Sequence, residues 1–320
     1  MCNKKKGDIM ELVVHLNSIK FINDFIEIGV KYFVVGTKYF SCRQALSLEY
    51  DELSDLKKRL GSSKVWVLVN ALIEEHNLDD LIEHLKKLDE LEVDGILFQD
   101  FSVLQICKEN NYDFQLIYNP DTLNTNQATL NYLASLGINS AFLAREIPLD
   151  EKVIIARNTV VKTMTQVHGV EYMAYSKRKL LSNYFKETGM KKAVSINDNI
   201  IIQANGVDYG CHIYEDQFGC HILSKKQICG LDTLSSFAGF DYLYIESLFI
   251  DDLKLVEIVN LYQDALNSIN NGTYGKERKE LLPQLHQLEP NVDFHHSFMF
   301  DATVYKIDDV RKREENEKHK

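Results

Sequence analysis

The sequence predicts an α/β fold, a (β/α)8 barrel of the TIM type with parallel strands. Short runs of β-branched and other apolar residues alternate with stretches that have helical spacing, and eight such units precede residue 268. One irregular stretch, 169–238, separates the seventh unit from the eighth. A length of 320 residues suits one barrel with an appendage.

The predicted strands are short apolar runs of the length expected for buried parallel strands. The first seven span 11–16, 32–36, 65–70, 94–98, 114–118, 139–144 and 160–167. Amphipathic spacing between them is clearest over 78–91, where leucines and an isoleucine form one face and charged residues the other. The eighth strand is predicted at 242–246 and its helix at 251–267.

These elements define the expected organisation of the chain. The barrel covers 10–268 and contains a mostly β insertion at 169–238, in which residues 211–222 predict a hairpin around a turn. A C-terminal extension follows at 269–305. The charged tail, 306–320, is expected to be disordered.

Composition excludes several classes of protein. Hydrophobic residues make up 45% and charged residues 26%, and no apolar run approaches the roughly 20 residues that cross a bilayer. We therefore expect a cytoplasmic protein with no membrane partner. A net charge of -11 opposes non-specific binding to DNA. Six scattered cysteines are too few for a disulfide framework.

Polar residues close the predicted strands, and strand ends at the C-terminal face of a barrel are where function collects. We predict catalytic roles for a histidine, an arginine and two acids: His168, Arg145, Glu146 and Asp100. We predict ligand-binding roles for Arg43, Asn70, Asn119 and Glu246. Such a mixed ring suits a small anionic ligand held by arginine. The alternative is that these residues cap helices or pair across the rim.

No metal site is expected. Cys211-His212 and Cys220-His221 carry zinc-ligand residue types, but neighbours in a strand point to opposite faces and no C-x2-C spacing occurs. Nucleotide-binding glycine motifs, zinc-protease motifs and the serine-hydrolase elbow are also missing from the sequence.

A basic segment stands out in this acidic chain. Residues 177–192 carry six Lys or Arg and one Glu, which leaves -16 for the remainder. With aromatic residues interleaved, the segment suits a phosphate backbone, and Lys177, Arg178 and Lys179 are its predicted nucleic-acid contacts. The alternative is a solvated loop.

The run from Gln166 to Ser182, which reads Gln-Val-His-Gly-Val-Glu-Tyr-Met-Ala-Tyr-Ser-Lys-Arg-Lys-Leu-Leu-Ser, resembles the signature of the collagenase-like "U-thirty-two" peptidases of unassigned catalytic type. That signature is His-Gly-x-x-Cys-Met-x-Tyr-Ser-Gly-x-Cys-Leu-x-Ser. Further matches cover most of 10–268, among them Leu143-Ala-Arg-Glu146 and Ile245-Glu246.

The resemblance implies a barrel and, for several members, hydroxylation of RNA or of quinone precursors with a [4Fe–4S] cluster on four cysteines. Here Tyr172 and Lys179 stand at the first two cysteine positions, and 189–195 lacks the last pair. Iron needs thiolate ligands, so no cluster is expected on this chain.

The chain is more similar to a cluster-less branch tied to 5-hydroxyuridine in tRNA, found in low-GC Gram-positive bacteria beside a cluster-bearing paralogue. The resemblance therefore implies a subunit of a system that hydroxylates wobble uridine, with tRNA and that paralogue as partners. A collagenase-like peptidase and a non-catalytic scaffold remain as alternatives.

Overall fold

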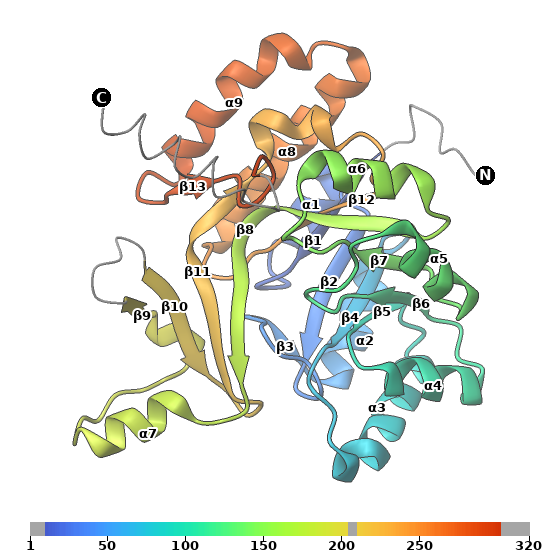
Figure 1. The fold of residues 1–320 in the computed structure, drawn as a ribbon, viewed down its shortest axis with the longest axis vertical. Helices are drawn as coiled ribbons and strands as arrows, with labels where there is room; N and C mark the ends of the chain where they lie inside the picture. The colour runs from blue at the N-terminus through green and yellow to red at the C-terminus, as the bar shows by residue number, and fades with distance from the viewer. Residues whose placement is uncertain (1–9, 204–209, 302–320) are drawn as a thin grey trace, which may run out of the picture.

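The computed structural model describes residues 10–203 and 210–301. Eight parallel strands close into a barrel, because the last strand pairs with both the first and the seventh (Figure 1). In spatial order these strands are β12 (Tyr242–Ile245), β1 (Glu11–His15), β2 (Tyr32–Thr37), β4 (Lys64–Val69), β5 (Gly95–Phe98), β6 (Gln115–Tyr118), β7 (Ser140–Phe142) and β8 (Lys162–Ser176). The predicted fold class is confirmed.

The strand bounds agree with the sequence prediction to within two residues, with one exception. Strand β8 does not stop near 167 but continues to Ser176, beyond the barrel wall. A two-residue strand, β3 (Ser47–Leu48), pairs with β2.

Helices surround the barrel and bury the outer faces of its strands. They are α1 (Ile22–Ile28), α2 (Tyr50–Leu60), α3 (Leu78–Glu90), α4 (Phe101–Asn110), α5 (Gln127–Ser135), α6 (Leu149–Asn158) and α8 (Asp252–Asn271), with the short η1 (Glu75–Asn77) and η3 (Leu231–Phe237). A second, smaller core fills the barrel interior around Trp66, Met164 and Tyr242. Because side chains pack this interior, the barrel is not a pore.

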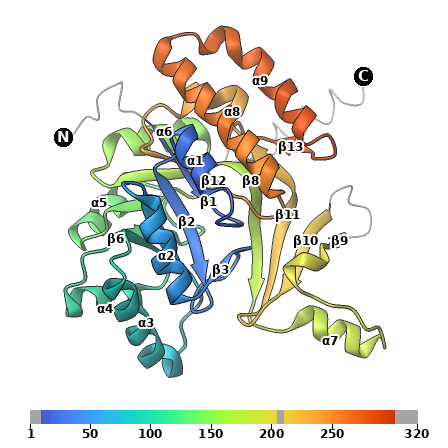
Figure 2. The ribbon, with the colours of Figure 1, turned by 180° about the vertical axis from the view of Figure 1, so that it is seen from behind.

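The chain between β8 and β12 forms an antiparallel extension that we call the wing. Its strands are the outer half of β8, β11 (Cys220–Cys229), β10 (Gly210–Glu215) and β9 (Ile200–Gln203). The wing also carries α7 (Leu180–Glu187) and η2 (Ile196–Asp198), and Figures 1 and 2 show it projecting from one side of the barrel. The hairpin predicted at 211–222 lies within β10 and β11.

The C-terminal extension packs on the barrel and returns to the wing. Helix α9 (Tyr274–Leu288) contacts α8 and η3, and β13 (Phe294–His295) pairs with β11. Of the predicted tail, 306–320, all residues lie outside the described part of the chain. None of the helices described spans enough apolar residues to cross a membrane.

Candidate functional site

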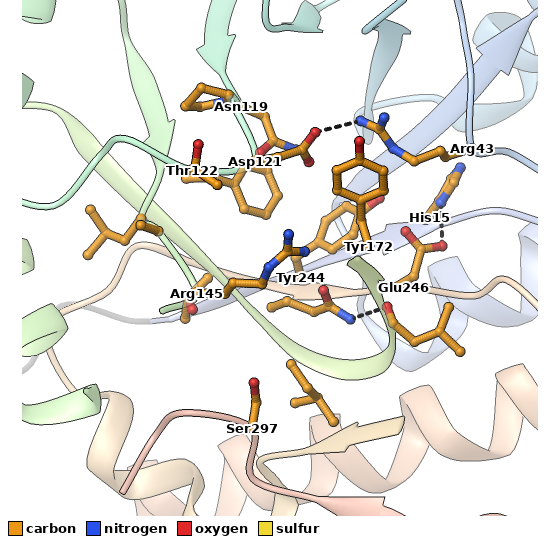
Figure 3. A pocket seen from close by; sticks show the side chains of 18 of the residues that line it. His15, Arg43, Asn119, Asp121, Thr122, Arg145, Tyr172, Tyr244, Glu246 and Ser297 are labelled. Atoms are coloured by element: carbon orange, nitrogen blue, oxygen red, sulfur yellow. Dashed lines mark hydrogen bonds and ion pairs between the residues drawn. The ribbon is translucent and has the colours of Figure 1, made fainter. Parts of the chain in front are cut away.

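A polar cavity lies at the C-terminal ends of the barrel strands, beneath the wing and the segment after β13 (Figure 3). The space within it that the centre of a water molecule can occupy has a volume of about 90 Å³. One water needs roughly 10–15 Å³ on this measure, so the space suits a ligand of roughly six to nine non-hydrogen atoms. The polar lining residues are His15, Arg43, Asn70, Asn119, Asp121, Thr122, Arg145, Lys152, Thr165, Gln166, Tyr172, Tyr244, Glu246 and Ser297.

The loop after β2 positions Arg43. The Asn70 amide clamps this loop: its Oδ1 accepts from the Cys42 backbone N–H at 2.9 Å and its Nδ2 donates to the Cys42 carbonyl at 3.1 Å. Arg43 itself adopts a φ of 59°, in the left-handed region that residues with a Cβ rarely occupy. Asn70, predicted to bind ligand, therefore serves chiefly to hold Arg43 in place.

Arg43 is the central cation of the cavity. Its Nη2 donates to Asp121 Oδ2 at 3.0 Å, and its guanidinium carbon lies 4.2 Å from the centre of the Tyr172 ring. Burial disfavours the charged guanidinium, but the Asp121 carboxylate acts together with the neighbouring Cys42, Tyr172 and Tyr214 to keep the pKa of Arg43 above its ordinary value. The Arg145 guanidinium lies 5.4 Å from the same Tyr172 ring. Two cations therefore meet at one aromatic side chain.

Lys152 adds a third cation from α6. Its side chain is buried, and Nζ donates to the Arg145 carbonyl at 3.2 Å. Burial lowers the pKa of Lys152 to about 8, although Glu171 and Glu146 act in the opposite direction. A lysine with this pKa changes its charge just above neutral pH.

The cavity also contains a pair formed by His15 and Glu246. His15 Nδ1 lies 2.8 Å from Glu246 Oε1, which also accepts from the backbone N–H groups of Ser247 and Leu248. A carboxylate oxygen accepts hydrogen bonds, so the His15 Nδ1 that faces it is the donor of this pair. Its Nε2 is buried and has no partner among the described residues. Because His15 lines the cavity, Nε2 can accept a hydrogen bond from a ligand.

His168, predicted to be catalytic at the mouth, is not part of the cavity. Between Gln166 and His168 the register with β12 slips, so Val167 and His168 both turn to the outer face. The ring packs against Tyr262 of α8, and burial lowers the pKa of His168 to about 3. The prediction took His168 as the residue that closes a strand ending at 167, but β8 continues to Ser176 and a bulge turns this side chain to the outer face.

Gly169 makes this bulge possible. Its φ is +94°, and a Cβ there would lie 2.1 Å from the Glu246 carbonyl oxygen. The Gln166 amide braces the turn by donating to the carbonyls of His168 and Val170. The His-Gly pair thus shapes the wall behind Glu246 and supplies no side chain to the cavity.

The other predicted residues divide between the cavity and its surroundings. Arg43, Asn70, Asn119, Arg145 and Glu246 all line the cavity. Asp100 caps α4 instead, with Oδ1 accepting from the Ser102 N–H at 2.9 Å. Glu146 lies outside the cavity and pairs with Arg145 at 3.5 Å. For Asp100 and Glu146 the rim interpretation fits better than a catalytic one.

The predicted nucleic-acid contacts are partly occupied by protein. Lys177 Nζ lies 2.6 Å from Glu74 Oε1, and Lys179 Nζ donates to the Asp216 carbonyl. Arg178 between them is exposed and forms no ion pair with the residues that the structure describes. The segment therefore offers less free charge than its composition indicates.

The donor set at the family cluster position does not fit iron. The Tyr172 ring is engaged by Arg43, and the Lys179 ammonium is engaged by Asp216, so neither position offers a thiolate. In the described part of the chain no three His, Cys, Asp or Glu side chains group as metal ligands. Burial raises the pKa of Cys42 and Cys220 to about 11, which keeps both thiols protonated.

Sequence reasoning missed His15, Asp121, Lys152, Tyr172 as a cavity wall, and Ser297. His15 is the last residue of β1 and fits the same strand-end rule that indicated Asn70. Lys152 and Ser297 carry no such signal, because they reach the cavity from a helix and from the C-terminal extension.

The chain is similar to known proteins over most of its length. A family model described as peptidase family U32 matches residues 17–307. The tRNA hydroxylation protein P2 of Bacillus subtilis (strain 168) is 30% identical over 308 residues, which cover 92% of this chain and 99% of that protein. The tRNA hydroxylation protein P1 of the same organism is 21% identical over 82% of this chain and 64% of its own length. The solved structure of the U32 peptidase Mk0906 aligns over 76% of this chain and 94% of its own, with 15% identity and a TM-score of 0.48.

Proposed function

Since this chain belongs to peptidase family U32, we propose that it acts in tRNA hydroxylation, as a subunit of the system that converts wobble uridine into 5-hydroxyuridine. The observation that carries the proposal is the similarity to the Bacillus subtilis tRNA hydroxylation protein P2, which extends over 92% of this chain and 99% of that relative. Because the substrate is tRNA, the proposed place of action is the cytoplasm.

The cavity gives this proposal a chemical role for the chain. Arg43, Arg145 and Lys152 supply positive charge, and His15 with Glu246 supplies a hydrogen-bonding pair. Arginine forks match carboxylate geometry, so the proposed ligand is a small carboxylic acid that carries a hydroxyl or another donor for His15 Nε2. The cavity is too small for a whole nucleotide, and we propose that this ligand is separate from the tRNA.

We propose that the redox centre belongs to a partner. This chain offers no thiolates at the positions of Tyr172 and Lys179, and the relatives P1 and P2 occur together in one organism. A cluster-bearing paralogue would supply the electron transfer, and this chain would supply the anion site. Purified alone, the chain is expected to be colourless and without stoichiometric iron.

Peptidase activity is the competing function, and the described residues provide little of the geometry that peptide hydrolysis needs. A nucleophile must be activated by a neighbouring base, and no Ser or Cys side chain among the described residues forms a hydrogen bond with a His ring. The Ser297 hydroxyl, which lines the cavity, donates to Glu171 at 2.7 Å. The other alternative, a non-catalytic scaffold, predicts that the cavity binds no ligand.

The deciding experiment is complementation in a Bacillus subtilis strain that lacks its P2 relative. We expect this chain to restore 5-hydroxyuridine and its derivatives in tRNA, measured by mass spectrometry of total nucleosides. The matched control is the same chain carrying the Arg43→Met substitution. Failure of the expressed wild-type chain to restore the nucleoside, with cleavage of denatured collagen by the pure protein, would establish the peptidase alternative instead.

Anion binding at the cavity is expected to weaken as the pH rises through about 8, the pKa of Lys152. Lys152 is charged below this pH and neutral above it, so a charge-assisted contact worth a roughly ten-fold change in affinity is lost. Titration calorimetry with malate as the probe at pH 7 and pH 9 measures this change. Lys152→Met should bind malate weakly at both values. A pH step of equal size in that variant would assign the titration to another group.

A further inference from the structure

A groove on the outer face of the wing lies across β8 from the cavity. Val170 and Tyr172 face the cavity, whereas Glu171 and Met173 face the groove, because neighbours in a strand point to opposite sides. The groove has a volume of about 410 Å³, within the range of small-molecule sites. It is lined by Arg145, Glu146, Glu171, Met173, Gly210, Cys211, Ser224, Lys225, Lys226, His295, Ser297 and Phe298.

A bulge in β11 places two lysines at the rim of this wing groove. Leu223 pairs with Tyr172 and Gln227 with Val170, so three residues of β11 oppose Glu171 alone. Ser224 braces the bulge: its Oγ accepts from the Glu171 N–H at 2.8 Å and donates to the Lys226 carbonyl at 2.6 Å. Lys225 and Lys226 are exposed and form no ion pair with any described residue. Bulges commonly redirect side chains at functional sites.

Two exposed hydrophobic side chains of the wing groove, Met173 and Phe298, offer apolar surface to a flat aromatic ring of a ligand. Met173 is 51% exposed and Phe298 is 45% exposed, although both are large hydrophobic side chains. They come from β8 and from the segment after β13. An exposed aromatic ring beside free lysines is the arrangement that single-stranded nucleic acid uses, with bases stacked and the backbone neutralised.

The wing groove shares two lining residues with the cavity. Arg145 and Ser297 line both, and the Arg145 guanidinium lies near Tyr172 on the cavity side. Ser297 is fixed by its hydrogen bond to the buried Glu171. A group held in the groove therefore lies next to residues that contact the cavity ligand.

We propose that the wing groove binds one nucleotide of single-stranded RNA, with its base against Phe298 and Met173 and its phosphates on Lys225 and Lys226. This inference rests on the proposed function for the choice of RNA. The groove is large enough for a nucleotide, whereas the cavity is not. The groove is distinct from the segment 177–179, where two of the three cations are engaged by protein.

Fluorescence anisotropy with a labelled anticodon stem-loop RNA tests the proposal, using the full chain alone and with its paralogue. Lys225→Ala/Lys226→Ala should weaken binding and reduce the salt slope by roughly 1.4, about 0.7 for each single-strand phosphate contact. Phe298→Ala should weaken binding by roughly five-fold or more at every salt concentration and leave the slope unchanged. The matched control is Lys276→Ala/Lys279→Ala, which removes two exposed lysines of α9.

Unchanged affinity and slope in both groove variants overturn the proposal, and so does the absence of RNA binding by the wild-type chain in both settings at low salt. If the groove variants bind RNA normally but lose the paralogue, the groove is a protein interface. Failure of the proposed function is a separate result: RNA binding would depend on the groove while complementation restores no 5-hydroxyuridine.

Discussion

Replacing Arg43 with methionine is expected to weaken anion binding in the cavity strongly and to destabilise the fold. Arg43 is buried and pairs with Asp121 at 3.0 Å, so the substitution leaves a carboxylate without its cation. Breaking a buried pair in this way costs about 3–5 kcal/mol in the free energy of unfolding. The lost guanidinium should also weaken binding of a small carboxylate by roughly 100-fold. Denaturant unfolding and calorimetry with malate measure the two effects.

Two further variants separate these effects. Arg43→Met/Asp121→Asn removes the orphaned charge, so stability should return toward the wild-type value while malate affinity stays low. Arg43→Lys keeps the charge but loses the planar fork that faces Tyr172, so partial affinity is expected. If the double variant binds malate as tightly as the wild type, Arg43 is a structural cation and not a ligand contact.

The fold was predictable because its pattern is regular. The runs at 32–36 and 65–70, for example, became β2 and β4, and eight units correctly indicated a closed barrel. The exception, β8, depends on its partners. Residues 168–176 alternate less clearly, and they remain a strand because β11 supplies hydrogen bonds along one edge.

The site was predictable where a polar residue closes a strand or lies in the loop that follows it. Arg43, Asn119, Arg145 and Glu246 were found by that rule. His168 was misplaced because a bulge depends on the close approach of Gly169 to Glu246, a contact between segments distant in the chain. Lys152 and Ser297 were missed for the same reason, since their positions depend on tertiary packing.

Replacing His15 with glutamine is expected to reduce tRNA hydroxylation by roughly 100-fold or more, the usual contribution of a positioned proton-transfer group. The buried Nε2 has no partner in the described structure, and an unpaired buried nitrogen costs about 1–3 kcal/mol. Such a cost at a cavity wall fits a group that is paired when ligand is bound. Glutamine is also polar and of similar size, so the fold should persist. Quantitative mass spectrometry of 5-hydroxyuridine in the complementation strain measures the loss.

Two measurements test whether His15 contacts the ligand or only supports the fold: NMR of its ring nitrogens and comparison with a variant at another buried histidine. Nitrogen NMR of the wild-type protein should show Nδ1 protonated, and Glu246→Gln should disturb this arrangement because the carboxylate no longer fixes the proton. His84→Gln is the matched control. His84 is also buried, and its Nε2 also has no partner among the described residues, but its Nδ1 bonds Tyr50 away from the cavity. That variant should lose stability without losing specific activity. If His15→Gln behaves in the same way, the cavity acts through its cations alone and His15 takes no part in the chemistry.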